Sequence, residues 1–335
     1  MCKICTNTYK ESKTIDMCDD ADYIPVSCVV ETLFCNDRIK IVPFLPNLTH
    51  LDCCNSDIYS IPLLPRLRTL ECSNTLIQWV HNYPMLVELD VSNTKIQIIP
   101  KIETLRSLSV ERTLVKSLPD LPNLKKLYCG FTKIKILPEC PKLTHLSCLS
   151  TDIEAIPLYT ELKNLDCSDT KVTKLPYFPK LQDLSINNTY IETIPTYYRL
   201  DRLECTNTLI RELPHLINLT DLNCSDTKIQ EIPLSEKLNH IVCMNTNLVR
   251  IPLLPNLLYL NCRGSRSLIY IPPYLRMAIT RDCTWFNRTK KMECLLVNCQ
   301  KIVRKWRERR HFNIRLTLIK YIPIELINLI CKSYL

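Results

Sequence analysis

One stretch of the chain is Leu162-Lys163-Asn164-Leu165-Asp166-Cys167-Ser168-Asp169-Thr170-Lys171-Val172, and its pattern returns every 19 residues. Its first leucine recurs without a gap in twelve consecutive units. These leucines are Leu48, Leu67, Leu86, Leu105, Leu124, Leu143, Leu162, Leu181, Leu200, Leu219, Leu238 and Leu257. A unit this short cannot bury an apolar face alone, so its copies must stack into a solenoid with one continuous core.

The whole unit has the pattern L-x-x-L-x-C-x-x-T-x-I-x-x-I-P-x-x-P-x. The L-x-C part alternates apolar residues with others, which predicts a half-buried strand, and the prolines prevent a helix on the return path. We therefore expect one short parallel strand per unit and an irregular, proline-rich convex side. At a strand spacing of about 4.8 Å, roughly thirteen units would form a curved array about 60 Å long.

The quoted stretch resembles the L-x-x-L-x-L-x-x-N-x-L core of the leucine-rich repeat family, and the resemblance covers residues 28–275. The I-P-x-x-P ending is similar to the short repeats of bacterial effector proteins and of mimivirus-like, large amoebal viruses. The resemblance implies an α/β-type solenoid that is mainly β. Threonine replaces the family asparagine in most units, and its hydroxyl is expected to bridge stacked turns, helped by the Asn or Asp before it.

The cysteines follow the repeat. Nine of the twenty occupy one position of the unit, where Val91, Val110 and Ile186 fill the remaining places. They are Cys53, Cys72, Cys129, Cys148, Cys167, Cys205, Cys224, Cys243 and Cys262. Interchange with Val and Ile predicts small, buried, reduced side chains, and hence an intracellular protein, cytoplasmic or in a host cytoplasm if viral. Residues 1–14 are polar and no run approaches 18 apolar residues, so no signal peptide or membrane span is expected.

No catalytic constellation is evident. Only two glycines occur, which excludes a glycine-rich nucleotide loop. Cys2 and Cys5 have half the spacing of a zinc site, but residues 1–27 contain no histidine to complete it. His50, His145 and His240 share a column but lie five repeats apart, too far for one site. We predict a chain that is not an enzyme and has no cofactor or metal.

The two ends differ from the array. Residues 1–27 show no recognisable periodicity and are predicted to be a tail and cap. The first unit, with Val30, Leu33, Cys35 and Pro43, is one residue short, as capping repeats often are. The repeats are predicted to end at residue 275. Residues 276–335 form a basic region, in which residues 276–320 carry thirteen Lys or Arg against three acids.

Residues 289–310 have the apolar spacing of an amphipathic helix, for which we predict a C-terminal α-helical cap. Gln300, Arg304 and Arg309 resemble the calmodulin-binding IQ motif, from which Cys299 and Lys305 depart. The basic face of this helix is Arg304, Lys305, Arg307, Arg309 and Arg310. It is a candidate site for calmodulin, nucleic acid or anionic lipid, or else a solvated face of the cap.

Residues 322–335 resemble the first helix of an F-box, which recruits a ubiquitin-ligase scaffold. The rest of an F-box is missing, and the usual order of F-box before repeats is reversed. An F-box-like adaptor that delivers bound proteins to a ubiquitin ligase is therefore an alternative function. The other interpretation is a terminal helix that packs on the basic one.

The outward strand positions are rich in acids, with nine among 36 positions, whereas bases number only Lys126, Arg202 and Arg263. The acids are Asp52, Glu71, Glu88, Asp90, Glu111, Asp166, Asp183, Glu204 and Asp221. Asp52, Glu71 and Asp90 occupy one column on three successive rungs, where like charges repel. This predicts a monomeric, non-catalytic protein-binding module whose concave face takes a partner with a basic surface. The alternative is chance clustering on a face that must be polar.

Overall fold

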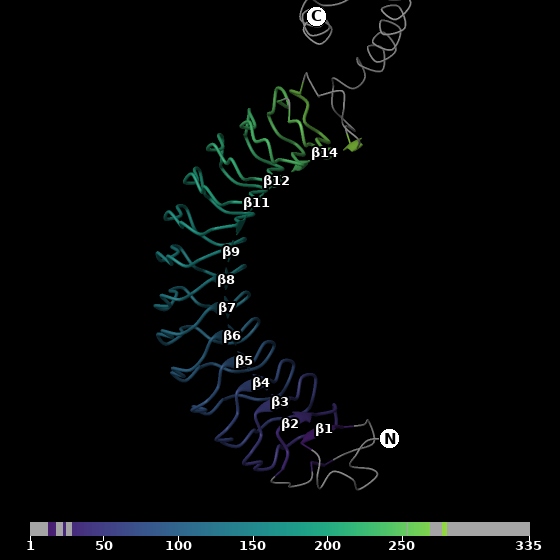
Figure 1. Cartoon of the computed structure of the whole chain (residues 1–335). Coiled ribbons are helices and arrows are strands. Elements are labelled where there is room, and N and C mark those ends of the chain that lie inside the picture. The colour runs from purple at the N-terminus through teal and green to yellow at the C-terminus, as the bar shows by residue number, and fades with distance from the viewer. Residues whose placement is uncertain (1–12, 18–22, 25–28, 253, 269–276, 280–335) are drawn as a thin grey trace, which may run out of the picture. The chain divides into compact units, whose positions relative to one another are not determined.

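The computed structural model describes residues 13–17, 23–24, 29–252, 254–268 and 277–279. Within them, fifteen three-residue strands form one parallel sheet in chain order (Figure 1). The strands are β1 (Thr14–Asp16), β2 (Thr32–Phe34), β3 (His50–Asp52), β4 (Thr69–Glu71), β5 (Glu88–Asp90), β6 (Ser107–Ser109), β7 (Lys126–Tyr128), β8 (His145–Ser147), β9 (Asn164–Asp166), β10 (Asp183–Ser185), β11 (Arg202–Glu204), β12 (Asp221–Asn223), β13 (His240–Val242), β14 (Tyr259–Asn261) and β15 (Met277–Ile279).

The register confirms the predicted repeat. Between β3 and β14, each residue pairs with the residue 19 positions later, as Asn164 does with Asp183. The offset is 18 at the N-terminal end, where Thr14 pairs with Thr32 and Thr32 with His50. The short first unit is therefore a true rung. Two further strands were not predicted: β1 lies in the segment without visible periodicity, and β15 lies beyond residue 275.

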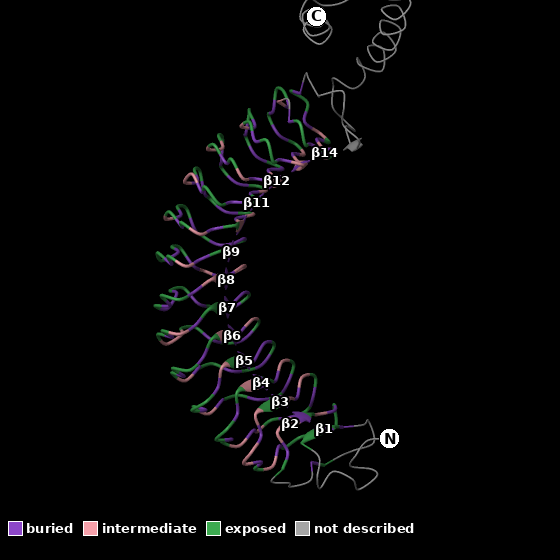
Figure 2. Ribbon diagram, in the orientation of Figure 1, coloured by how far each residue is buried: buried purple, intermediate pink, exposed green. Residues whose placement is uncertain are grey.

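The strands line the concave side of the array, and the return segments lie on its convex side (Figure 1). Strand side chains alternate, so the middle residue of each strand from β1 to β14 is buried. Buried residues recur in both the strand and the return path of each coil, so the core runs between the two. Figure 2 marks buried residues in purple along the ribbon. The sheet has to be the inner side of the curve because strands stack at about 4.8 Å while the proline-containing returns need more room. The mainly β solenoid with one strand per repeat is confirmed.

Each strand from β3 to β14 is followed by a turn with one residue in the left-handed region. Eleven non-glycine residues at one repeat position have φ between 53° and 57°, and Gly264, at the same position of the following repeat, has φ 74°. They are Asn55, Asn74, Asn93, Arg112, Phe131, Ser150, Asp169, Asn188, Asn207, Asp226 and Asn245. Asn and Asp tolerate this conformation best among residues with a side chain, which explains their frequency here.

These asparagines also connect neighbouring rungs, as predicted. Asn207 Nδ2 donates to Asn188 Oδ1 at 2.9 Å, and Asn188 Nδ2 donates to Asp169 Oδ1 at 2.8 Å. Where Arg112 and Phe131 occupy the position, the amide ladder is replaced by a guanidinium 3.9 Å from the centre of the aromatic ring. The turns are thus held together along the array by side chains as well as by the sheet.

The prediction that the threonine hydroxyls bridge stacked turns is wrong, because they donate their hydrogen bonds within their own turns. Thr170 Oγ1 donates to the carbonyl of Cys167 at 2.6 Å, and Thr227 Oγ1 donates to that of Cys224 at 2.6 Å. The short hydroxyl therefore closes its own turn, satisfying a buried carbonyl three residues earlier, instead of bridging two turns. At the end of the array, Thr246 Oγ1 does lie 2.9 Å from Ser265 Oγ of the next rung.

The predicted C-terminal helices, at residues 289–310 and 322–335, lie outside the described residues. The part of the chain that the structure describes contains no helix. Among these same residues, no helix is long and apolar enough to cross a membrane.

Candidate functional site: the concave face

Eight of the nine predicted acids belong to strands of the concave sheet, where the alternation with buried leucines turns them toward solvent. Glu111 follows two residues after β6. The face thus carries a row of exposed or half-buried carboxylates over β3–β5 and a second group over β9–β12.

The first row concentrates negative charge. Asp52, Glu71 and Asp90 are direct register partners on β3, β4 and β5. Burial raises the pKa of Glu71 above its usual value, and the nearby Asp52, Asp90 and Glu88 raise it further. In the described part of the chain, no Lys or Arg forms an ion pair with these four acids. The fold therefore holds these carboxylates together without neutralising them.

Three of the aspartates have a local role that the sequence did not reveal. Asp52 Oδ1 accepts a hydrogen bond from the backbone N–H of Cys54 at 3.0 Å. Asp90 and Asp166 each accept the same kind of bond from the backbone N–H two residues later, at 2.9 and 3.0 Å. Asn223 makes the equivalent bond to Ser225 at 3.2 Å, so the turn needs an oxygen acceptor and not a charge. The local bond explains a short polar side chain but leaves the negative charge unexplained.

The second group surrounds a shallow cavity of about 290 Å³ over β7–β11. Its lining includes Tyr128, His145, Asp166, Arg202 and Glu204. Burial lowers the pKa of His145, with Lys126 and Lys163 adding to the shift. The imidazole is therefore mostly uncharged at neutral pH.

The three concave histidines do not form one site. His50, His145 and His240 lie on β3, β8 and β13, with four strands between each neighbouring pair, as the sequence predicted. His240 instead stacks on Tyr259 of the next strand, with ring centroids 4.3 Å apart.

One group in the described residues has metal-ligand types close together. Ligand atoms of Asp52, Cys54 and Glu71 lie within 4.8 Å of one another. Burial raises the pKa of the Cys54 thiol to about 11, and Ser73 donates a hydrogen bond to its sulfur. A metal would therefore have to displace a proton from a thiol that is neutral at physiological pH, and the arrangement gives no further sign of a cation site.

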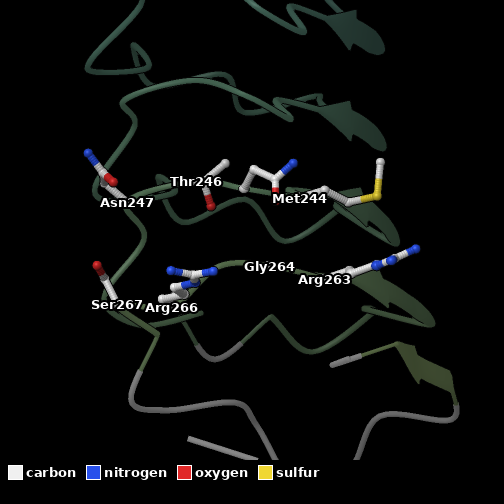
Figure 3. A pocket seen from close by; sticks show the side chains of 8 residues that line it. Met244, Thr246, Asn247, Arg263, Gly264, Arg266 and Ser267 are labelled. Atoms are coloured by element: carbon white, nitrogen blue, oxygen red, sulfur yellow. The ribbon is translucent and has the colours of Figure 1, made fainter. Parts of the chain in front are cut away.

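A larger hollow of about 570 Å³ lies beside the turns of the last described repeats. Arg263 and Arg266 both line it, but their side chains point apart and do not converge on one position (Figure 3). Gly264 has φ +74°, and a Cβ there would meet Asn245 Oδ1 at 2.1 Å, so a residue with a side chain at this position would displace the Asn245 amide. The hollow lies against this turn, and its two arginines do not converge to form an anion-binding site.

The nine column cysteines are fully buried thiols, as the sequence predicted. Burial raises the pKa of Cys129 and of Cys224 to about 12, so these thiols stay protonated. They belong to the core and take no part in the concave surface.

Comparison with known proteins identifies the fold class. No protein-family model and no curated protein matches the sequence. Solved leucine-rich repeat structures do match it, so the chain has the fold of leucine-rich repeat solenoids.

Among these structures is YopM from Yersinia enterocolitica WA-314, with 22% identity and a TM-score of 0.63, over 77% of this chain and 70% of that one. YopM, a leucine-rich effector protein from Yersinia pestis, matches with 19% identity and a TM-score of 0.66, over 83% and 90% of the two chains. The functional domain of InlJ from Listeria monocytogenes, which includes a cysteine ladder, matches with 21% identity and a TM-score of 0.61, over 70% and 63%. The predicted likeness to viral repeat proteins stays a prediction.

Proposed function

We propose that the chain is a non-catalytic protein-binding module, and that its concave face binds a partner with a basic surface. The observation that carries the proposal is the column Asp52–Glu71–Asp90, in which three carboxylates face one another across adjacent strands. Like charges directly opposite destabilise a sheet, and the local turn bonds would be made equally well by asparagine. A binding function accounts for the charge.

The curved, rigid array supports the proposal physically. A concave sheet presents side chains from many strands to one partner without the ordering cost of loops. Charge complementarity across such a surface speeds encounter and disfavours wrong partners. The predicted monomeric state, the intracellular location and the roles of the segments 289–310 and 322–335 remain predictions beside it.

The test neutralises the column with isosteric residues, in the variant Asp52→Asn, Glu71→Gln and Asp90→Asn. Affinity capture with the intact chain from its native cells should lose a partner that the wild type retains, and the retention should depend less on salt. The matched control is Glu154→Gln, Glu192→Gln and Glu212→Gln, which removes three exposed acids from the return path. Equal retention by the column variant and the wild type would exclude the column as the site.

Thermal stability gives an independent readout of the same variant. Because the pKa of Glu71 is raised in the fold, its ionisation costs stability, and the cost appears as pH rises through that pKa. The neutralised variant should therefore melt at or above the wild-type temperature at pH 7. Its advantage should shrink as the solution is acidified and Glu71 takes up a proton. A lower melting temperature at pH 7 would show that the charges stabilise the fold.

A further inference from the structure

The cavity over β7–β11 arises from side-chain size. One column of the face reads Tyr128, Ser147, Asp166, Ser185 and Glu204 on five successive strands. The short serines leave a depression between the longer side chains, and its lining is mostly apolar. Leu146, Leu165 and Leu184 lie beneath it with their side chains buried in the core, so the apolar surface comes mainly from the residues around them, and the rim is polar.

The rim carries uncompensated negative charge. Asp183 accepts hydrogen bonds from Arg202 Nε, at 2.6 Å, and from Asn164 Nδ2, so its charge is paired. Glu204 Oε2 accepts only from neutral groups, Asn187 Nδ2 at 3.1 Å and the Ser185 hydroxyl at 3.5 Å.

Asp166 accepts from the Ser168 N–H. Among the residues that line the cavity, three carboxylates stand against one guanidinium, which pairs with Asp183. Lys126 and Lys163 lie close enough to act on His145, but in the described part of the chain neither forms an ion pair with Asp166 or Glu204.

We infer that this cavity is a specificity pocket for one lysine or arginine side chain of the bound partner. The aliphatic stem of such a side chain would cover the apolar surface of the depression, and its cationic head would lie between Asp166 and Glu204. The strands that carry these two carboxylates are two apart, or about 10 Å, and the cation would occupy the space over β10 between them. An uncharged apolar group would desolvate both carboxylates without compensation, and an anion would be repelled.

The inference rests on the proposed function, because it names the group that the concave face recognises. It can nevertheless be tested without the partner. The probes are Ac-Gly-Ser-Arg-Ser-Gly-NH2, its lysine analogue and its citrulline analogue, which keeps the shape of arginine but not the charge. Each is titrated to millimolar concentration into the ¹⁵N-labelled full chain.

The arginine and lysine peptides should shift the backbone amide signals of Ser147, Asp166 and Ser185, which line the cavity, saturably. The citrulline peptide should bind about ten-fold more weakly, as expected for the loss of two partly exposed ion pairs. The double variant Asp166→Asn and Glu204→Gln, in which both amides can still accept the local hydrogen bonds, should show the same loss. Glu154→Gln, on the return path, should leave the peptide affinity unchanged.

Ser147→Tyr fills the cavity with the residue that stands one rung earlier in the column, so the fold should accept it. This variant should abolish the shifts. Equal binding of the arginine and citrulline peptides, wild-type binding by Ser147→Tyr, or no saturable shift would overturn the inference. If the arginine peptide binds but partner capture is unchanged by neutralising the Asp52–Glu71–Asp90 column, the proposed function is refuted and the pocket is not. If partner capture is lost in that variant but no peptide binds the cavity, the pocket is refuted and the proposed function is not.

Discussion

Cys167→Asp is expected to destabilise the repeat array by about 3–5 kcal/mol, because it places an unpaired charge in the core. Cys167 is fully buried, with no exposed surface, and burial raises the pKa of its thiol far above the usual value. An aspartate there either stays charged without a partner or takes up a proton at a cost in free energy. Urea unfolding followed by circular dichroism would measure the loss.

Cys167→Val is the matched control and should be nearly neutral. Valine already fills the same repeat position at Val91 and Val110, and both are fully buried. The contrast between the two variants tests whether the column is apolar packing. If Cys167→Asp unfolded at the wild-type urea concentration, or if Cys167→Val were the more damaging change, the column would have another role.

Tyr197→Ala should cost a similar amount, about 3–5 kcal/mol, because it removes a large side chain from a packed interior. Tyr197 is only 1% exposed, and its ring stacks on Tyr177 and Phe178 with centroids 6.0 and 6.2 Å away. Its hydroxyl donates to the carbonyl of Pro176 at 2.9 Å.

Tyr197→Phe separates these contributions. It keeps the ring and loses one hydrogen bond to a carbonyl in the return path, for which about 1 kcal/mol is expected. Melting curves of the two variants, recorded side by side, provide the measurement. Equal losses would mean that the hydroxyl, and not the ring, holds the return segments together.

The strand register and the buried core could be predicted because a strict repeat allows only one way to stack the units. A leucine every 19 residues fixes which residue stacks on which, and the buried columns follow. β1 was missed because its rung has no leucine at the repeat positions and is offset by 18 residues. The only signal there is the alternation of Ile15 and Met17, both buried in the structure.

The turn chemistry was less accessible from sequence. A threonine hydroxyl can reach a neighbouring rung or its own turn, and residue type does not distinguish the two. The left-handed conformation of Asn207 and its equivalents became visible only with the backbone. The aspartate bonds, such as Asp52 to the Cys54 N–H, share that geometry.

The concave acids were predictable as exposed residues, since alternation within each strand decides the side on which they lie. The pocket was not, because it depends on side-chain sizes in two neighbouring columns over five strands. Ser147 and Ser185 look unremarkable along the sequence. Only the register places them between Tyr128 and Glu204, where their small size produces a depression.

Site-specific photo-crosslinking tests the proposed binding face most directly. A photoreactive residue is placed at Thr69 of β4, beside the acidic column, or at Thr173, which is exposed on the return path. After irradiation with the captured partner, a covalent adduct is predicted from position 69 and not from position 173. An adduct from position 173 without one from position 69 would contradict binding on the concave face.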